Sequence, residues 1–592
     1  MIHTETAYDV VVVGSGGGGL RAAIGAAQAG ARTLVVCRGK ANRSGATLLA
    51  GANISADIAC DGATLSRLGI SHSNKDDTPD TWFRDVVREG FYLNNQDLVR
   101  LFVDTAGDRL EELLQWGLTV RGMEGEREVS VFGSDILDAL YGRAKTLGVE
   151  FLPDTLFTDL LQKDGQVTGV VCVDLASGAL KAIPAGAVVL CTGGAHNLFS
   201  ENSGSTDLCG EGQAAAFRAG AELVDMEMIS FCPTVTRFPT MYKGNILPYI
   251  FITTGYGSLL NKYGKTFTHR YLSPKVEQLA LDSEWNKMLL SYAIQSEILS
   301  GRGAKDGGVY FSLPSHPAEI MEELYRDLPP LTTGIYADIM KIFAAGRSLT
   351  VQPAAHYFEG GIRVAPDMST ALPGLFAAGE CAGGLFGANR VSAATTEMLV
   401  EGAAAGRSAA AFAQGAAAPV VDSAALDQLE EELLRPFGRT GGPAPHELKR
   451  RLHEITGSSL TVIRREEELK KALAGLKELE AQLPLVSFTD RNRTYNRQWR
   501  EYLELRNMLP CAWAITRSAL LRRESRGVHV RSDCPQTDNS RCLYNIVLSH
   551  RGGVETLVPA VLTHTKPRDG VWRYTEYIEQ VVEELDGEEV RP

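Results

Sequence analysis

Residues Tyr8–Ala27 read YDVVVVGSGGGGLRAAIGAA, and this stretch decides the fold. Its four consecutive valines predict a buried strand of a parallel sheet, because such strands are apolar on both faces. The glycines that follow match the G-x-G-x-x-G turn, in which a helix begins directly after the strand, and Thr33–Cys37 supplies a second strand at the expected distance. We therefore predict an α/β protein whose first turn binds a pyrophosphate.

The glycines of this turn have distinct predicted roles. Gly14 allows the tight turn, Gly16 lets the backbone approach the pyrophosphate, and Gly19 lets the helix pack closely on the strand. The N-terminus of the helix adds N–H groups and a favourable dipole. A complete NAD fingerprint would end the second strand in an acid, whereas Arg38 follows the strand here. No second clean G-x-G-x-x-G occurs, so no nicotinamide site is evident.

The composition is that of a large, acidic, globular protein. Among 592 residues there are 59 Lys and Arg against 72 Asp and Glu, a net charge of −13, and 44% are hydrophobic. The apolar content excludes disorder, and the negative charge argues against nucleic acid as a partner. No apolar run approaches the roughly 20 residues of a membrane-spanning helix, and residues 1–8 do not look like a signal segment. The ten cysteines contain no C-x-x-C pair, so we expect a cytoplasmic protein without a metal site of its own.

Seven further motifs follow along the chain. They are Ala187–Ala195 (AVVLCTGGA), Asp225–Thr234 (DMEMISFCPT), Gly301–Gly303 (GRG), His356–Ile362 (HYFEGGI), Leu375–Glu380 (LFAAGE), Gly387–Arg390 (GANR) and Arg523–His529 (RESRGVH). From Tyr8 to about Tyr544, their order and spacing resemble the succinate dehydrogenase/fumarate reductase flavoprotein family. That family also contains L-aspartate oxidase and the α subunit of adenylylsulfate reductase.

The resemblance implies a domain organisation. A Rossmann-like FAD-binding domain would take residues 1–234 and 351–414, interrupted by an α+β capping domain over 235–350. A mainly helical C-terminal domain would take 423–592, after an Ala/Gly/Pro linker over 409–419. Charged amphipathic helices are expected within the C-terminal domain, followed by short strands at Asn545–Leu548 and Glu555–Val561.

The same resemblance implies which residues bind FAD. They are Gly14, Ser15, Gly16, Gly17, Gly18, Gly19, Arg38, Ser44, Thr47, Gly51, Thr192, Gly193, Gly194, Asp207, Gly361, Gly379, Glu380, Arg390, Thr395 and Thr396. In the respiratory members of the family a histidine is joined covalently to FAD, and Gly45 stands at that position here. We therefore expect FAD to be bound without a covalent bond.

Family enzymes move a hydride between the flavin and a carbon next to a carboxylate, so a small-molecule carboxylate is the implied substrate. His356 and Arg390 occupy the two carboxylate-binding positions of the family, and Thr234 matches a threonine that hydrogen-bonds the substrate. The planar fork of an arginine suits a carboxylate because it can bind both oxygens. A lone histidine is more often structural, but within HYFEGG we interpret His356 as functional.

Three departures from the family put plain succinate and fumarate in doubt. Cys232 replaces a substrate-binding histidine, and Ser392–Thr396 replaces a Gly-Gly-Asn-Ser run, although Thr395 and Thr396 keep hydroxyl groups for the flavin edge. The proton-shuttling arginine is missing, and Asp282 or Lys287 takes its position, depending on the gap. A desolvated Lys287 could donate a proton; the alternative is a solvated helix residue.

Electrons must come from outside the chain, because it contains no cluster ligands. An iron–sulfur partner subunit or a soluble donor could supply them, and oxygen could instead accept electrons, which would make the protein an oxidase. Partner subunits could hold the protein at the inner face of a membrane. Five C-terminal arginines either dock such a partner or pair with local carboxylates. They are Arg517, Arg522, Arg523, Arg526 and Arg531.

Two other readings of the function stay open at this point. An enzyme like adenylylsulfate reductase does not need the missing arginine, whereas one like aspartate oxidase does. A flavin-bearing electron-transfer subunit without its own substrate is the third possibility, against which the His356–Arg390 pair argues.

Overall fold

A twisted sheet at the centre of the computed structural model carries the glycine turn. The structure describes residues 2–56, 78–124, 127–247, 252, 256–282, 285–313, 321–322, 334–551, 554–560 and 564–585. The sheet has the order β7-β3-β2-β10-β9-β8, and two further strands, β1 and β17, also pair with β10. Strands β7 (Glu150–Leu152), β3 (Thr33–Val36), β2 (Tyr8–Val13), β10 (Leu180–Leu190) and β17 (Leu375–Ala377) run parallel. The predicted α/β class is confirmed.

Strand β10 is long enough to serve two partners. Its second half pairs in parallel with β2, and its first half pairs with the antiparallel strand β9 (Gln166–Asp174), which is followed in the sheet by β8 (Thr155–Lys163). The short β1 (His3–Thr4) lies along the same first half. Val10–Val13 are at most 3% exposed, because both faces of β2 are covered.

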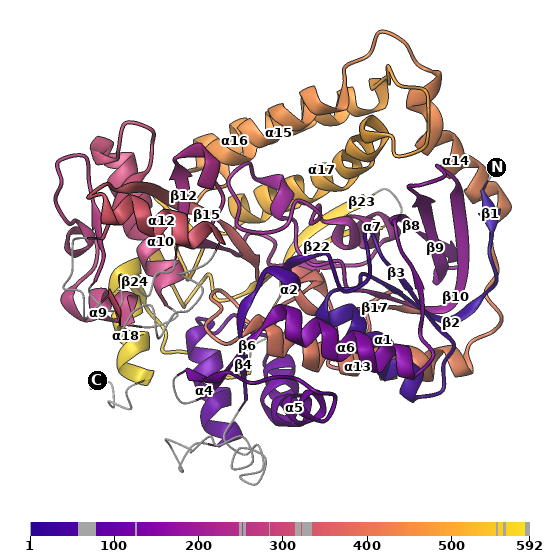
Figure 1. Cartoon of the computed structure of the whole chain (residues 1–592), viewed down its shortest axis with the longest axis horizontal. Coiled ribbons are helices and arrows are strands. Elements are labelled where there is room, and N and C mark those ends of the chain that lie inside the picture. Colours follow the sequence, from indigo (N-terminus) through magenta and orange to yellow (C-terminus); the bar gives the residue numbers. More distant parts are fainter. Residues whose placement is uncertain are drawn as a thin grey trace.

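Four helices cover one side of this sheet. Figure 1 shows α1 (Gly17–Gln28), α5 (Gln96–Gln115), α6 (Gly133–Thr146) and α13 (Ala394–Gly415) gathered there, with α7 (Glu211–Ala219) on the other side. The linker predicted over 409–419 is wrong for its first part, since α13 continues to Gly415. The alanines and glycines there allow close helix packing instead: a Cβ on Gly406 would lie 2.0 Å from the Ala22 oxygen of α1.

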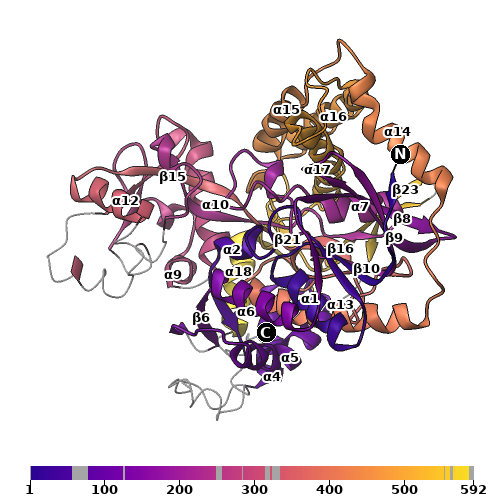
Figure 2. The same cartoon turned by 45° about the vertical axis from the view of Figure 1, so that its right-hand side comes forward.

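A lobe at one end of the molecule corresponds to the predicted capping domain (Figures 1 and 2). Its sheet has the order β12-β15-β14-β13. The lobe consists of β12 (Ile229–Phe238), β13 (Ser258–Leu260), β14 (Val309–Ser312), β15 (Leu349–Phe358) and the helices α9 (Pro274–Asp282), α10 (Asn286–Glu297) and α12 (Gly334–Ala344). The predicted boundaries at 234 and 351 fall within β12 and β15, so these paired strands connect the lobe to the body. The exact domain limits stay a prediction.

The C-terminal part of the chain begins with four helices. These are α14 (Ser423–Gly438), α15 (Pro445–Ser459), α16 (Glu466–Gln482) and α17 (Arg497–Leu521). The chain then returns to the body, where β22 (Asn545–Arg551) and β23 (Val554–Ala560) extend a sheet formed by β18 (Ala382–Gly383), β16 (Gly361–Arg363) and β11 (Leu223–Val224).

Smaller elements complete the fold. They are α2 (Ala46–Leu49), α4 (Pro79–Glu89), α18 (Tyr574–Leu585), the sheet of β4 (Gly51–Ser55), β6 (Glu128–Phe132) and β5 (Gly122–Glu124), and the pairs β19 (Ile463–Arg464) with β20 (Val530–Arg531) and β21 (Gln536–Asp538) with β24 (Val571–Arg573). None of the helices in the described ranges combines the length and apolar character that a bilayer crossing requires.

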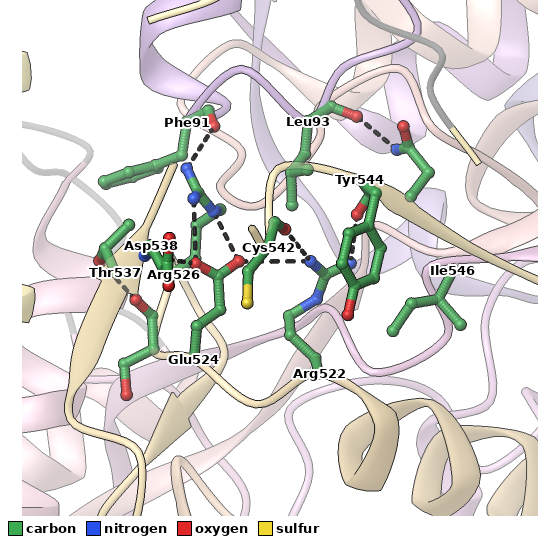
Figure 3. A network of polar contacts seen from close by, with 12 residues as sticks. Phe91, Leu93, Arg522, Glu524, Arg526, Thr537, Asp538, Cys542, Tyr544 and Ile546 are labelled. Atoms are coloured by element: carbon green, nitrogen blue, oxygen red, sulfur yellow. Dashed lines mark hydrogen bonds and ion pairs between the residues drawn. The ribbon is translucent and has the colours of Figure 1, made fainter. Parts of the chain in front are cut away.

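Buried arginines join the C-terminal segment to the rest of the chain (Figure 3). Arg522 donates from Nε to Glu227 at 2.6 Å and from Nη2 to Asp225 at 3.2 Å. Arg526 pairs with Glu524 at 2.8 Å, and Arg531 pairs with Asp533 at 2.6 Å. All three arginines have no exposed surface and pair with carboxylates, so for them the structure favours the second of the two alternatives, ion pairs within the chain, over docking of a partner. Only Arg517 and Arg523 of the predicted group lie at the surface.

Candidate active site

A cavity of about 1340 Å³ opens where the parallel strands end. Val13, Val36, Cys191 and Ala378 line it, and each lies at or just after the carboxyl end of β2, β3, β10 or β17. This is the edge at which open α/β sheets bind their ligands. The lobe and the β4-β6-β5 sheet supply the remaining walls. The volume exceeds the roughly 300–1,000 Å³ of a typical small-molecule pocket, so it has room for a dinucleotide and a small substrate.

The glycine turn forms one end of the cavity and suits a pyrophosphate. Gly14 has a φ of +110° and a Cβ there would lie 2.2 Å from the Cys191 oxygen, so both backbone shape and space require glycine. A Cβ on Gly16 would meet nothing closer than the Thr47 hydroxyl at 3.7 Å, which leaves the backbone open to a ligand. Helix α1 has neither a side-chain cap nor an acid in its first turn. Gly17 N donates to the Thr47 hydroxyl at 3.2 Å, and the other N–H groups of the first turn and the helix dipole favour an anion.

Backbone donors converge on Glu380 in the middle of the cavity wall. Gly194 N donates to its carboxylate at 3.1 Å and Phe358 N at 3.2 Å. The neighbouring Gly379 has a φ of +67° and its N–H donates to Glu401 at 2.7 Å. These contacts fix the turn after β17 against the turn after β10, so the two predicted Gly-rich segments meet at one place.

Arg38 lies in the cavity wall but is already neutralised. Its guanidinium donates to the Asp207 carbonyl at 2.7 Å and pairs with Glu211 and Glu504. Because Glu504 belongs to α17, this network also ties the C-terminal helices to the cofactor end of the cavity. The acid that a strict NAD fingerprint requires after the second strand is therefore replaced by an arginine held between acids from other parts of the chain.

The opposite end of the cavity contains Lys287, His356 and Arg390. Arg390 is 7% exposed, donates from Nη1 to the Ser392 carbonyl at 3.1 Å and stacks on the Tyr357 ring at 4.6 Å. Its buried Nε has no hydrogen-bond partner, and no carboxylate pairs with it within 4 Å in the described part of the chain. A cation of this kind suits an anionic ligand.

Burial and neighbouring charges tune the other two groups. Burial, followed by the nearby Lys287 and Arg390 cations, lowers the pKa of His356 well below its usual value, so the imidazole is neutral. Its Nδ1 lies 2.8 Å from the Ser203 hydroxyl. Burial and Arg390 lower the pKa of Lys287 to about 7. Lys287 is 7% exposed, which excludes the alternative of a solvated helix residue. The Asp282 side chain lies outside the described residues.

Comparison with known proteins agrees with this geometry. The FAD binding domain model matches residues 9–396, and the model of the fumarate reductase flavoprotein C-terminus matches residues 449–568. The chain belongs to the fumarate reductase/succinate dehydrogenase flavoprotein family. It is an FAD-dependent oxidoreductase, and the predictions of family, fold class and FAD are confirmed.

Relatives of this flavoprotein cover nearly its whole length. It is 33% identical over 546 residues to a fumarate reductase (CoM/CoB) subunit of Methanothermobacter marburgensis, covering 89% of this chain and 95% of that protein. It is 31% identical to a Mycobacterium tuberculosis fumarate reductase flavoprotein subunit, covering 95% and 99%. The solved structure of Mycobacterium smegmatis Sdh1 in complex with UQ1 matches with a TM-score of 0.83 at 30% identity, covering 96% of each chain.

Not all of the predicted FAD and substrate residues of the flavoprotein line the cavity. Those that do are Gly14, Ser15, Gly16, Gly17, Gly18, Arg38, Ser44, Thr47, Thr192, Gly193, Asp207, Gly379, Glu380, Arg390 and Thr395, together with Lys287 and His356. The cavity-lining residues do not include Thr234, Gly19, Gly51, Gly194, Gly361 or Thr396.

Local packing explains the residues that lie behind the wall. A Cβ on Gly19 would lie 1.9 Å from the Gly14 oxygen, which is the close helix–strand contact predicted for it. Gly361 is instead needed between strands, because a Cβ there would lie 2.5 Å from the Ala382 oxygen. Gly51 pairs with Phe132 in the β4-β6 ladder, and the Gly194 N–H donates to the Glu380 carboxylate, which itself lines the cavity.

Hydroxyl groups that were expected to face ligands bind backbone instead. Thr234 is fully buried and donates to the Leu247 carbonyl at 2.8 Å. Thr396 donates to the Ser55 carbonyl at 2.8 Å, and Thr395 donates to the Asn53 carbonyl. These bonds fix α13 on β4, so neither threonine has its proton available for the flavin edge.

Several wall residues were missed by sequence reasoning. Ser203 bonds to His356, and the Tyr357 hydroxyl donates to Glu397 next to Arg390. Ile246 and Tyr336 of the lobe also line the cavity. Tyr357 stands inside the HYFEGG motif and could have been found from it. The other residues lie in segments without a motif.

Proposed function

We propose that this flavoprotein reduces a carbon–carbon double bond next to a carboxylate, or oxidises the saturated acid. The observation that carries the proposal is the convergence of Lys287, His356 and Arg390 at one end of a cavity whose other end is the glycine turn. The names of the relatives support the same class, since several are fumarate reductase flavoprotein subunits.

Arg390 is the proposed carboxylate clamp. Its guanidinium is buried and unneutralised, and its contact with the Tyr357 ring restricts its orientation. A charge-assisted, two-pronged contact with a carboxylate would satisfy it. His356 adds a neutral imidazole beside the clamp, held by Ser203 at Nδ1. Together these groups orient an acid whose reacting carbons lie next to the carboxylate.

Lys287 is the proposed proton donor. Reduced FAD, when bound, would supply a hydride for one alkene carbon. Lys287, as an ammonium, gives its proton to the other carbon, and the resulting amine regains a proton from solvent. The pKa of about 7 suits this role, because a donor works best when its pKa is near the working pH. In the oxidative direction the neutral amine would accept the proton.

The residues that would hold FAD fit the group. The open backbone at Gly16 and the N-terminus of α1 suit the pyrophosphate, and Thr192–Gly193 and Gly379–Glu380 line the path between the turn and Arg390. Gly45 also lines the cavity, and nothing lies within 4 Å of the place of its Cβ. With no side chain at this position to form a bond, we infer that FAD binds non-covalently.

An iron–sulfur partner subunit is the proposed source of electrons. Groups of three or more metal-ligating side chains are absent from the described residues, and several relatives are named as subunits of larger enzymes. Through such subunits the protein would sit peripherally on a membrane.

An adenylylsulfate-reductase-like activity is a second candidate. It is favoured by the absence of the family's proton-shuttling arginine, whose position Asp282 or Lys287 takes, because that chemistry does not need the arginine. An aspartate-oxidase-like reaction and a purely electron-transferring role are weaker alternatives, and both are included in the test.

The test uses the FAD-loaded protein under anaerobic conditions with reduced methyl viologen. Enoates and adenylylsulfate are offered in turn with this donor, and aspartate, which must be oxidised, is offered with an oxidised dye as electron acceptor instead. Turnover and changes in the flavin spectrum are recorded in each case. Reduction of an enoate, lost in Arg390→Gln and partly kept in Arg390→Lys, supports the proposal. Turnover of adenylylsulfate alone favours the second candidate. Turnover of none, with no spectral change, overturns the enoate reaction.

A further inference from the structure

One part of the cavity wall near Lys287 has little polar character, although Ser203 and Glu128 also line the cavity close to His356 and Lys287. Cys232, Ile246 and Tyr336 line it there, and all three belong to the lobe. Cys232 forms a small hydrophobic cluster with Val235 and Ala354, and Ile246 packs against this cluster. The Tyr336 hydroxyl donates to the Ile246 carbonyl at 3.1 Å, so its proton is already engaged.

The positive charge at this end is limited. Arg390 is the one permanently charged group that the described residues place there. The two other cavity-lining arginines are engaged elsewhere: Arg38 is bound by Glu211 and Glu504, and Arg121 lies over the Phe132 ring and beside Asp135. His356 is neutral, and burial raises the pKa of the Cys232 thiol to about 11, so it is uncharged too. Lys287 is the other cation near Cys232, and the proposed reaction assigns its proton to an alkene carbon, which leaves Arg390 as the cation for one carboxylate.

We infer that the substrate is a monocarboxylate enoate whose other alkene substituent is an alkyl or aryl group seated against Cys232, Ile246 and Tyr336. This inference rests on the proposed function. A second carboxylate in that place would lose its hydration against a thiol, an aliphatic side chain and a ring. The cation near Cys232 would be Lys287, whose pKa of about 7 leaves it only partly charged at neutral pH. An apolar group would instead leave water for a surface that matches it.

The test compares substrates that differ only at this substituent. Fumarate and trans-crotonate share the four-carbon skeleton, but one carries a carboxylate where the other carries a methyl group, and cinnamate carries a phenyl ring. With the FAD-loaded protein and reduced methyl viologen, we expect kcat/KM for crotonate or cinnamate to exceed that for fumarate by at least about 10-fold, because small changes in an apolar pocket are worth about 10–200-fold. Equal or better use of fumarate overturns the inference.

A variant pair localises the effect. Cys232→His places a hydrogen-bonding, protonatable ring in the apolar wall, and we expect the preference to shift at least about 10-fold toward fumarate. Cys232→Ser is the isosteric control and keeps the wall uncharged, so the preference for crotonate should persist. Met241→His in the same lobe is 76% exposed and should leave the ratio unchanged. FAD content and thermal midpoint confirm that each variant folds, and an unchanged ratio in a folded, FAD-loaded Cys232→His overturns the inference.

The two possible failures are distinguishable. If fumarate perturbs the flavin spectrum and is reduced faster than crotonate and cinnamate, the proposed reaction stands and the apolar subsite is wrong. If no enoate is reduced and none changes the flavin spectrum, the proposed function fails and this inference falls with it.

Discussion

Two buried arginines of this flavoprotein differ in whether carboxylates of the chain pair with their charge. Arg522, in the C-terminal segment, is completely buried and is bonded to Glu227, Asp225 and Glu524 at 2.6, 3.2 and 3.4 Å. Arg390, at the end of the cavity, is almost as buried but donates to one backbone carbonyl and leaves Nε unpaired. The first arginine has its counter-charges within the chain, whereas the second lacks a carboxylate partner among the residues that the structure describes.

Direct contacts, and not the protonation of the nearby acids, make this difference. Burial raises the pKa of Glu359 near Arg390 to about 7, and it raises the pKa of Asp225 beside Arg522 to about 7 as well. Arg522 nevertheless touches three carboxylates, whereas Arg390 touches none among the described residues. A paired charge such as that of Arg522 contributes to the fold, while an unpaired charge such as that of Arg390 costs stability and is kept where a ligand supplies the missing anion.

The largest expected effect tests the cavity side of this comparison. Lys287→Met should lower enoate reduction by about 10²–10⁴-fold, the usual contribution of a general acid, because methionine fills similar space but has no proton to give. FAD content and the thermal midpoint should stay close to those of the parent. The exposed Lys305→Met of the same lobe is the control and should keep full activity. Unchanged reduction by Lys287→Met would remove Lys287 from the mechanism.

The second prediction concerns the ion pairs of Arg522 and is tested by the free energy of unfolding. Arg522→Gln should reduce the free energy of unfolding by about 3–5 kcal/mol, since three buried carboxylates lose their shared cation. The adjacent Arg523 is 70% exposed, and Arg523→Gln should leave the midpoint near that of the parent. Urea unfolding of the two variants measures the difference. If both variants unfold alike, the ion pairs of Arg522 with Glu227, Asp225 and Glu524 do not stabilise the junction.

The glycine turn could be predicted because its causes are local. The strand, the positive φ at Gly14 and the close contact at Gly19 all depend on residues within one βα unit or on the backbone beside it. The order of the motifs likewise predicted the family. The same local reasoning failed for Arg522, whose partner Glu227 lies 295 positions away along the chain.

Burial and alternative partners account for most of the remaining differences at the site. Lys287 is the second residue of helix α10, in which every residue over Asn286–Ser291 is buried. The sequence there has no alternation between a buried and an exposed face, so it gives no sign of whether Lys287 is buried. The hydroxyls of Thr395 and Thr396 found carbonyl acceptors on β4, a strand more than 300 residues earlier. Hydrogen bonds between such distant segments depend on how the whole chain packs, so the sequence around Thr395 and Thr396 does not predict them.

Binding of FAD should slow hydrogen exchange in the region of the cavity but not in the region of Arg522. Non-covalent FAD at about 100 times its Kd stabilises the fold by about 2.7 kcal/mol, and the added protection should appear in Gly14–Gln28 and around Arg390. The segment Arg522–Arg531 should change little, because its charges are already paired. Exchange of apo and FAD-loaded protein measures this contrast, and acid precipitation should release all the flavin. Flavin that stays with the precipitate would contradict non-covalent binding at Gly45.

The smallest expected effect is a change of the reaction rate with pH, which should depend on the cavity and not on the Arg522 network. With a pKa of about 7, Lys287 is an ammonium below neutrality and loses its proton above it. Since reduction uses the ammonium, kcat for enoate reduction should be flat below about pH 7 and fall about tenfold per unit above it, while oxidation of the saturated acid should rise over the same range. None of Arg522, Asp225, Glu227 and Glu524 lines the cavity, so Arg522→Gln should leave this inflection of the rate in place. Lys287→Met should lack the inflection, and an inflection above pH 9 would show that the amine titrates as an ordinary solvated lysine, contrary to its place in the cavity wall.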